Sequence, residues 1–582
     1  MGSSLNTLNT LFFIALSVLS ITAILNRFVF PRVIPQQKNR IGNKKEQQRQ
    51  KHWTGFQKDD FVLSTRAYNI ILISIIVIGV VIRVWRFGAV PGGFNQDGAM
   101  AAVDGKALAD YGTDRFGTWL PAHLYAWGYG QMSSLLSYLI AVFVKIFGLS
   151  PITARLPQLL ASLMGGVFFF LFVKDVFGKG AGLIAAAFVA IDPWHLLQSR
   201  WALDCNLLPH FFMGGLYFLH KGLVGKKKFV YISMIFFGLC MYCYGITIYT
   251  IPAFLAAAAV YYIIKKRLDI KTVAISVGVY LLIAWPFLLT MMVNFFKWDT
   301  IKLPFVTIQC FSDSVRSNDI LLFSDQFITQ LGSNFRSLMN TTFLQKKDLP
   351  WNDIAGFGTT FLCSMPLFIA GIAGIISVKS DGVKSLAVFA ILTGVWAGLL
   401  TNNVNVNRIN IIYYGVMMFE AVGIYFVITE LKYSKWAMAA IYAVLGIMLV
   451  STYFTSYADE IGRYFYYGFG DALAEAEDSG AERIYVTADA QGKGYRGTSE
   501  IITMFYDKTD AKYFQGKTNV NNGRECWPYD QRFIYESMSA ELAQRTENED
   551  AAYVIMDSDR SFFDESEYMI NEHGNFCSVV KR

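Results

Sequence analysis

Charged and amide side chains gather in three short segments that lie beside long apolar stretches. The segments read FNQDGAMAAVDGKALADYGTDRFG with Asp97 and Asp104, DPWHLLQSRWALDCN with His195, Arg200, Asp204 and Asn206, and NNVNVNRIN with Asn407 and Arg408. Ionisable groups in or beside a bilayer are costly, so each of them needs a reason. Two carboxylates together with cations at a membrane surface suit a general base that acts next to a phosphate.

Most of these residues also have a structural interpretation. Asp97 follows Gly-Gly-Phe-Asn and fits an ordinary turn, and Asp204 follows an arginine by four residues and fits a helical ion pair. Arg408 fits a side chain that snorkels to lipid headgroups. For His195, packing is favoured over ligand binding, and Glu420, inside an apolar stretch, is interpreted as a polar contact between helices.

The composition indicates which elements must position these residues. Of 582 residues, 54% are hydrophobic and 16% charged, against about 25% charged in soluble domains, and the mean hydropathy is +0.36. These values exclude a disordered, collagenous or disulfide-dense chain and predict a polytopic α-helical membrane protein. Twelve spans are predicted at 11–30, 68–86, 155–173, 181–198, 206–220, 229–245, 247–264, 272–292, 356–377, 384–400, 410–429 and 435–453.

The distribution of basic residues predicts the orientation of these spans. The apolar segment 131–148 begins with polar residues and contains Lys145, so it either crosses or lies in the interface. If it does not cross, five short loops on one face carry 14 Lys or Arg, and the basic 31–67 loop joins them. The short turns on the other face carry two, Arg200 and Arg408. The positive-inside rule makes the basic face cytoplasmic, and 131–148 is therefore predicted not to cross.

Three regions follow from this arrangement. Residues 1–67 form an anchor helix and a basic cytoplasmic loop, and 68–454 form the transmembrane domain with outer loops at 87–154 and 293–355. Residues 455–582 hold 24 acidic and 13 basic residues, which indicates a separate outer domain. In it AERIYVTA, AKYFQ, DAAYVIMD and FCSVVK are predicted strands and 459–478 a helix, which gives a small α/β fold. Cys526 and Cys577 share this domain and could pair in an oxidising compartment.

The order of short motifs over most of 68–430 resembles the polytopic GT-C glycosyltransferases, and within them family 39, the protein O-mannosyltransferases and the aminoarabinose transferase of lipid A. The motifs are an acid in the first outer loop, Arg155-Leu156-Pro157, Phe177-Gly178, Pro193-Trp194-His195, and Ser199-Arg200-Trp201 followed by Asp204. There are two departures. The family often has Glu where Gly98 stands, and Lys-Pro-Pro where residues 123–131 read HLYAWGYGQ.

The resemblance implies that one sugar moves, with inversion, from a polyprenyl-phosphate donor to a hydroxyl of a protein, cell-wall polymer or lipid. The expected site consists of Asp97 as catalytic base, Asp204 as second acid, Arg408 as phosphate ligand, and Arg200, Asn206, Asp104, His195 and Asn407 as further substrate-binding residues. A divalent metal ion on Asp97 and Asp204 is a further expectation, and no nucleic-acid partner is expected. The expected location is the membrane of a bacterial cell, with the site outside.

The alternative function is a transporter or flippase of lipid-linked cell-envelope intermediates. A transporter should place charges near the bilayer midplane on broken helices. Here the predicted spans contain little charge besides Glu420, and the charged residues gather at one face. The sequence therefore favours the glycosyltransferase.

Overall fold

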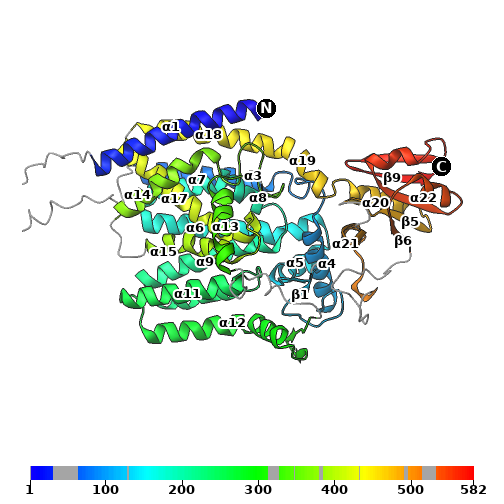
Figure 1. Cartoon of the computed structure of the whole chain (residues 1–582), viewed down its shortest axis with the longest axis horizontal. Helices are drawn as coiled ribbons and strands as arrows, with labels where there is room; N and C mark the ends of the chain where they lie inside the picture. The colour runs from blue at the N-terminus through cyan, green and yellow to red at the C-terminus, as the bar shows by residue number, and fades with distance from the viewer. Residues whose placement is uncertain are drawn as a thin grey trace, which may run out of the picture.

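The computed structural model describes residues 2–29, 63–126, 130–311, 321, 327–346, 348–378, 384–431, 433–490, 496–513 and 532–582. Most of the predicted basic loop 31–67 lies outside these residues, as do parts of the 293–355 loop and Cys526. Figure 1 shows an elongated molecule in which a helical body occupies most of the long axis and a small sheet domain lies at one end.

Each predicted span overlaps a described helix, although the helix in 356–377 begins only at Met365 and the segment 181–198 is divided between two helices. These helices are α1 (Gly2–Phe28), α3 (Thr65–Val84), α6 (Pro151–Phe177), α7 (Lys179–Ile191), α9 (Asp204–Val224), α10 (Lys228–Cys240), α11 (Thr247–Ile264), α12 (Ile270–Phe296), α14 (Met365–Ser377), α15 (Ser385–Leu400), α17 (Tyr413–Glu430) and α18 (Ser434–Phe454). Within the described ranges, seven helices are long and apolar enough to cross a membrane. The exact number of twelve crossings stays a prediction.

The centre of the body is α17, which is buried along almost its whole length. It packs most extensively against α14, and two glycines allow the close approach. A Cβ at Gly371 would lie 2.0 Å from the Phe419 carbonyl oxygen, and one at Gly423 would lie 1.9 Å from the Leu367 carbonyl oxygen. Small residues at such contacts let membrane helices pack backbone to backbone.

The first outer loop forms a helical layer at the end of this bundle. It contains α4 (Gln96–Tyr111) and α5 (Leu135–Phe147). Helix α4 ends at Gly112, whose φ of 71° is the left-handed conformation that glycine adopts most easily. Helices α4 and α5 pack on each other, and α5 also packs on α6. Helix α5 has 13 residues, as do α7, α10 and α14, so its length does not decide whether it crosses, and the interfacial placement of 131–148 stays a prediction.

The C-terminal domain contains a five-stranded sheet in the order β6-β5-β7-β9-β8. Its strands are β5 (Arg483–Thr487), β6 (Phe533–Glu536), β7 (Ala551–Met556), β8 (Tyr568–His573) and β9 (Phe576–Lys581). Strand β5 runs parallel to β6 and β7, whereas β9 runs antiparallel to both β7 and β8. The α/β interpretation of this domain is therefore confirmed.

Three details of that domain differ from the sequence-based expectation. The expected strand AKYFQ begins as a 3-10 turn at Ala511–Tyr513, and its last two residues lie outside the described chain. Strands β6 and β8 were not expected. The expected helix 459–478 is two helices, α19 (Ser456–Tyr464) and α20 (Phe469–Asp478). Between them Tyr466 and Gly468 have φ values of 59° and 91°, which break the helical backbone.

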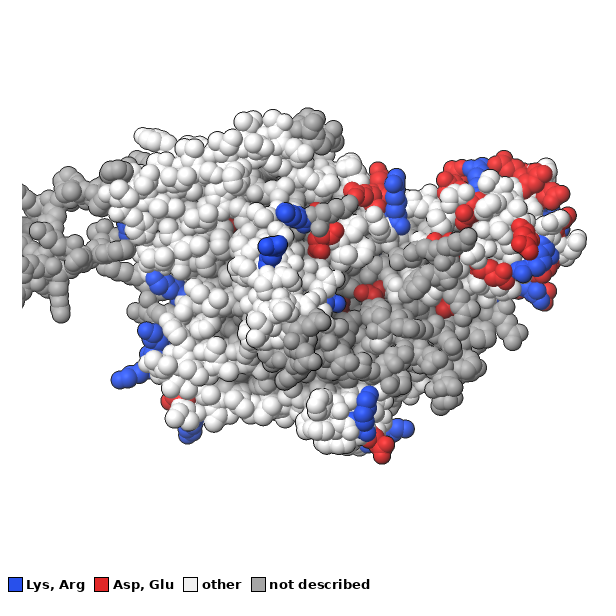
Figure 2. Space-filling view, viewed as in Figure 1, with Lys and Arg blue, Asp and Glu red and all other residues white. Residues whose placement is uncertain are grey.

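Surface charge divides the molecule along its long axis. Figure 2 shows Lys and Arg side chains on the end of the bundle opposite the C-terminal domain, whereas charges of both signs are mixed over that domain. The exposed basic residues include 226–228 in the α9–α10 turn and 265–267 in the α11–α12 turn. The side of the body that faces the viewer carries little charge, as a surface in contact with lipid requires.

Candidate active site

A cavity of about 210 Å³ lies where the helical body meets the C-terminal domain. Its walls come from five separate places in the chain: the start of α4, the turn before α9, the turn near residue 351, the loop before α17, and the end of α19. The lining residues are Asn95, Gln96, Asp97, Trp201, Leu203, Trp351, Asn407, Tyr464 and Phe465. Asp97 is the carboxylate among these lining residues, which makes it the candidate for acid–base chemistry.

The backbone around Asp97 is held from several sides. Asp97 lies in the first turn of α4, and the preceding Phe94 donates its backbone N–H to the Phe465 carbonyl oxygen. A Cβ on Gly98 would lie 2.8 Å from the Ala202 carbonyl oxygen, so the start of α4 packs directly against the turn before α9. On its other side Gln96 accepts a hydrogen bond of 3.0 Å from Thr498 of the C-terminal domain. The carboxylate is thus carried on a fixed helix end.

The second predicted acid lies just behind the cavity wall. Asp204 is the first residue of α9 and accepts a hydrogen bond of 2.7 Å from the backbone N–H of Cys205. Its neighbour Leu203 lines the cavity, whereas Asp204 does not. Asn206 is buried and accepts from the Asn410 amide at 3.2 Å, so it belongs to the packing beneath the site.

The loop before α17 brings the third predicted segment to the same place. Its short helix α16 (Val406–Ile409) is capped by Asn405, whose side chain accepts from the Arg408 backbone N–H at 3.1 Å. Asn407 lines the cavity. Arg408 is half-buried, and its guanidinium donates to the Thr401 hydroxyl at 3.3 Å. Arg408 is therefore next in sequence to the cavity wall without being part of it.

The structure places Arg200, an expected substrate-binding residue, inside the fold. This side chain is fully buried. Its Nε donates to the Tyr453 hydroxyl at 3.1 Å, and its two terminal nitrogens donate to the carbonyl oxygens of residues 82, 83, 85, 86 and 90. All its nitrogens are used by the protein, so Arg200 holds the segment that leads from α3 to α4.

His195 and Asp104, which were also expected to bind substrate, are likewise engaged by the fold. His195 is fully buried on the short helix α8 (Pro193–Gln198), with Nδ1 2.8 Å from Arg83 Nη2 and Nε2 3.0 Å from the Tyr414 hydroxyl. Asp104 is buried in an ion pair with Arg115 and accepts that residue's backbone N–H at 3.0 Å. Next to this pair, burial and then the charge of Asp104 raise the pKa of Asp114 to about 7. These groups stabilise the fold and lie outside the cavity lining.

Seven of the nine lining residues were not expected from the sequence, and four of them are aromatic: Trp201, Trp351, Tyr464 and Phe465. The Trp201 and Phe465 ring centroids lie 5.3 Å apart, and the Trp351 and Tyr464 centroids 6.2 Å apart. Trp201 stands inside the motif that carries the family resemblance, which could have drawn attention to it. Nothing in the local sequence connects Tyr464 or Trp351 with Asp97, because only the tertiary fold brings them together.

The described residues contain no group of three His, Cys, Asp or Glu side chains suited to a metal ion. Among the described residues, the cavity is lined by a single carboxylate. A divalent ion at Asp97 and Asp204 remains an expectation.

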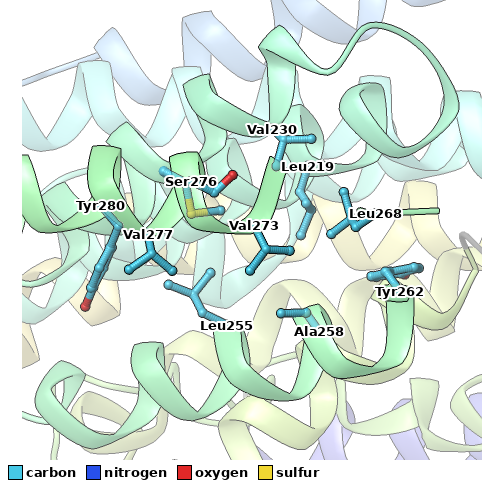
Figure 3. Close-up of a pocket in the computed structure, with 12 residues that line it drawn as sticks. Leu219, Val230, Leu255, Ala258, Tyr262, Leu268, Val273, Ser276, Val277 and Tyr280 are labelled. Atoms are coloured by element: carbon cyan, nitrogen blue, oxygen red, sulfur yellow. The ribbon is translucent and has the colours of Figure 1, made fainter. Parts of the chain in front are cut away.

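A second cavity inside the bundle has a very different lining. Figure 3 shows apolar side chains that converge between α9, α10, α11 and α12. The cavity that they line has a volume of about 70 Å³. Tyr262, Ser276 and Tyr280 are its polar members, and the Tyr262 hydroxyl is already hydrogen-bonded to Ser385 at 2.8 Å. With no carboxylate, imidazole or cation among the described residues of its lining, this cavity is unsuited to proton transfer.

Comparison with known proteins supports the interpretation of the fold. A family model described as dolichyl-phosphate-mannose-protein mannosyltransferase matches residues 133–293. Among solved structures, ArnT from Cupriavidus metallidurans bound to undecaprenyl phosphate has a TM-score of 0.51 at 12% identity, over 89% of this chain and 98% of that one. The chain has the GT-C fold. The likeness to ArnT carries this assignment, and it confirms the fold predicted from the motifs.

Two further results complete the comparison. The apo oligosaccharyltransferase from Archaeoglobus fulgidus has a TM-score of 0.46 at 14% identity, over 85% of this chain and 70% of that one. No curated protein matches the sequence. The family match covers α5 to α12 and therefore includes Asp204 but neither Asp97 nor Arg408. The GT-C fold and the mannosyltransferase match both agree with an integral membrane glycosyltransferase, and neither points to a transporter.

Proposed function

We propose that this GT-C protein transfers one sugar from a polyprenyl-phosphate donor to a hydroxyl acceptor, with inversion at the anomeric carbon. The observation that supports the proposal most directly is the place of Asp97. This carboxylate lines a cavity of about 210 Å³ between the membrane bundle and a polar domain. The similar protein ArnT binds undecaprenyl phosphate in its solved structure. An isoprenoid tail stays in the bilayer, so a phosphate on it lies at headgroup depth.

In the proposed reaction, Asp97 accepts the proton of the acceptor hydroxyl while that oxygen attacks the anomeric carbon. The new carbon–oxygen bond forms as the bond from the anomeric carbon to the phosphate oxygen breaks. The polyprenyl phosphate leaves with the electron pair, and Arg408 stabilises its charge. A positioned base contributes about 10²–10⁴-fold, and a positioned cation on the developing charge contributes a further factor of similar size.

The decisive experiment compares two aspartates on the same helix. Asp97→Asn should lower kcat for transfer from a polyprenyl-phosphate sugar in proteoliposomes by about 10²–10⁴-fold, because an amide does not accept the proton. Asp110→Asn is the matched control, since Asp110 lies on α4 in an exposed ion pair with Lys106 at 2.6 Å. It should leave transfer unchanged. Full activity of Asp97→Asn would remove Asp97 from the mechanism.

We also propose that the site and the C-terminal domain face away from the cytoplasm of a bacterial cell. The support is the excess of Lys and Arg in the loops at the opposite end of the bundle. Single cysteines introduced for Asn95 and Asn402 should react with a membrane-impermeant maleimide in intact cells, whereas one introduced for Lys266 should react only after lysis. Labelling of the first two positions from opposite sides would overturn both the orientation and the common site.

A further inference from the structure

Two residues that line the Asp97 cavity each have a polar atom that is buried without a hydrogen-bond partner among the described residues. One is the indole Nε1 of Trp201, a side chain that is 3% exposed. The other is the amide Oδ1 of Asn407. Both residues line the cavity. One atom is an obligatory donor and the other an acceptor.

Such a pair needs an explanation, because native proteins leave few buried polar atoms unpaired. The neighbouring polar residues of the fold are well satisfied: Gln96 is bonded to Thr498, and Asn410 donates to Gln198, Cys205 and Asn206. Other buried polar atoms of the described chain, such as Asn206 Nδ2, also lack a described partner, but Trp201 and Asn407 are the two such residues that line this cavity. A hydroxyl group donates and accepts at once, so a ligand with several hydroxyls satisfies both atoms.

The rest of the wall has the complementary chemistry. Trp201, Trp351, Tyr464 and Phe465 present aromatic surface, and Asn95 and Gln96 add amide groups. Sites of this kind bind the apolar face of a ligand on the rings and fix its orientation through a few polar groups. A sugar ring combines a C–H face with hydroxyls at its rim.

We propose that Trp201 and Asn407 determine sugar specificity, with the Trp201 indole N–H donating to one hydroxyl of the transferred sugar and the Asn407 amide oxygen accepting from another. This inference rests on the function proposed above and names the residues that recognise its substrate. It goes beyond a packing role for Trp201, since the contact of its ring with Phe465 does not use the N–H.

The test measures binding separately from transfer. The protein carries Asp97→Asn so that a bound donor is not consumed, and the probes are polyprenyl phosphates that bear glucose, galactose or mannose. Monodeoxy analogues of the tightest-binding sugar are then titrated against Trp201→Phe and Asn407→Leu. The control is Trp119→Phe, because the indole of Trp119 lies outside the cavity lining and already donates to the Pro304 carbonyl oxygen at 2.8 Å.

The expected result is a matched loss, by which we mean that removing the protein group and removing its partner hydroxyl from the sugar weaken binding to the same extent and without adding. Trp201→Phe should weaken binding of the complete sugar roughly tenfold, the size of one hydrogen bond that leaves a group unpaired. For one particular deoxy sugar, removal of the N–H should cause no further loss, because the partner hydroxyl is already absent. Asn407→Leu should show the same pattern with a different deoxy position, and Trp119→Phe should bind every probe as the parent does.

Two outcomes separate the inference from the function on which it rests. The inference is wrong if Trp201→Phe binds the complete sugar as tightly as the parent does. It is also wrong if the loss of affinity caused by Trp201→Phe adds to the loss caused by every deoxy position. Either result would hold even when the wild-type protein transfers sugar. If the matched loss is found but the wild-type protein transfers none of these sugars, the recognition site stands and the proposed reaction is wrong.

Discussion

Two polar clusters of this protein contain similar residue types and serve different purposes. In Arg200 and His195, each guanidinium or imidazole nitrogen is bonded to a backbone carbonyl or a buried side chain. In the wall of the Asp97 cavity, the Trp201 indole and the Asn407 amide oxygen have no described partner. The nitrogens of Arg200 and His195 are all used by the fold, although neighbouring Arg83 Nε, Arg155 Nε and His210 Nε2 have no described partner. The two clusters therefore differ in where their unpaired atoms lie: those of Trp201 and Asn407 belong to residues that line a cavity.

The arginines of this structural cluster nevertheless serve the site indirectly. Arg83 donates to carbonyl oxygens of residues 79, 189 and 190, and Arg155 donates to those of Gly88 and Gly93. Together with Arg200 they fix the segment that runs from α3 to the start of α4. Carbonyl oxygens of an irregular buried backbone need hydrogen-bond donors, and water is not available there to supply them. A buried arginine that donates to several of these oxygens fixes the backbone in place.

The largest effect that would sharpen this comparison is expected for Arg200→Met. The substitution removes a donor from five carbonyl oxygens, of which the Arg86 oxygen keeps the backbone N–H groups of Ala89 and Val90, and each buried group left unpaired costs about 1–3 kcal/mol. The free energy of unfolding should therefore fall by at least roughly 3 kcal/mol, measured by thermal unfolding of the purified protein in detergent. A stable Arg200→Met protein with a defect confined to donor binding would break the comparison.

Arg408→Gln should have the opposite signature. Its guanidinium has one described bond, to Thr401, so thermal stability should stay close to that of the wild type. Transfer should fall by roughly 10²–10³-fold, because the charge of the leaving phosphate loses its cation. Arg408→Lys should recover part of the rate, since the charge remains but the planar fork is lost. Unchanged transfer by Arg408→Gln would assign the phosphate to another residue.

A smaller effect is expected at the contact between the C-terminal domain and α4. Thr498→Val removes the hydrogen bond to Gln96 and keeps the shape of the side chain. Transfer should fall by roughly 2–10-fold, the size of one ordinary hydrogen bond. Ser499→Ala is the control, because Ser499 donates to the Thr487 carbonyl oxygen within its own domain. Equal rates for the two variants would show that this contact does not position Asp97.

The smallest effect concerns the stability of the C-terminal domain against pH. Arg532 forms ion pairs with Glu477 at 3.2 Å and Asp507 at 3.4 Å. Burial, and then the hydrogen bond to Asp507, raise the pKa of Glu477 from 4.5 to about 7. The folded domain keeps this proton where the unfolded chain has lost it, so the free energy of unfolding falls as pH rises from about 4.5 to 7. Above pH 7 this contribution is constant.

Glu477→Gln should flatten that dependence without an effect on transfer. Limited proteolysis of the full chain at pH 5, 6 and 7, with release of the C-terminal domain as the readout, measures the slope. The ratio of variant to wild type at each pH removes the pH dependence of the protease itself. Parallel slopes would mean that Glu477 titrates normally.

Much of the architecture could be predicted because it follows from local apolar runs. Each predicted span overlaps a helix, and α5 coincides with most of the apolar segment 131–148 in the predicted first outer loop. Strands β6 and β8 were missed because their side chains alternate weakly, as the partly exposed FIYE of β6 illustrates. The break between α19 and α20 was missed because it depends on the close approach of Gly468 to the backbone of His573, more than 100 residues away. A Cβ at Gly468 would overlap the His573 carbonyl oxygen.

The candidate site was predicted in part. Asp97 and Asn407 line one cavity, as the sequence indicated, whereas Arg200, His195 and Asp104 are engaged by the fold. A sequence shows that a charge lies near a membrane surface. It does not show whether a carbonyl or a carboxylate from another segment has already bonded it.

The sequence alone determined that this protein is a membrane-embedded helical bundle with an acidic α/β domain and an aspartate at the start of its first outer helix, because hydropathy and charge act locally along the chain. The tertiary structure alone decided which polar atoms remain unpaired, and it brought Trp201, Trp351 and Tyr464 around that aspartate. Hydrogen-bond saturation is a property of contacts between distant segments, and those contacts exist only after the chain has folded.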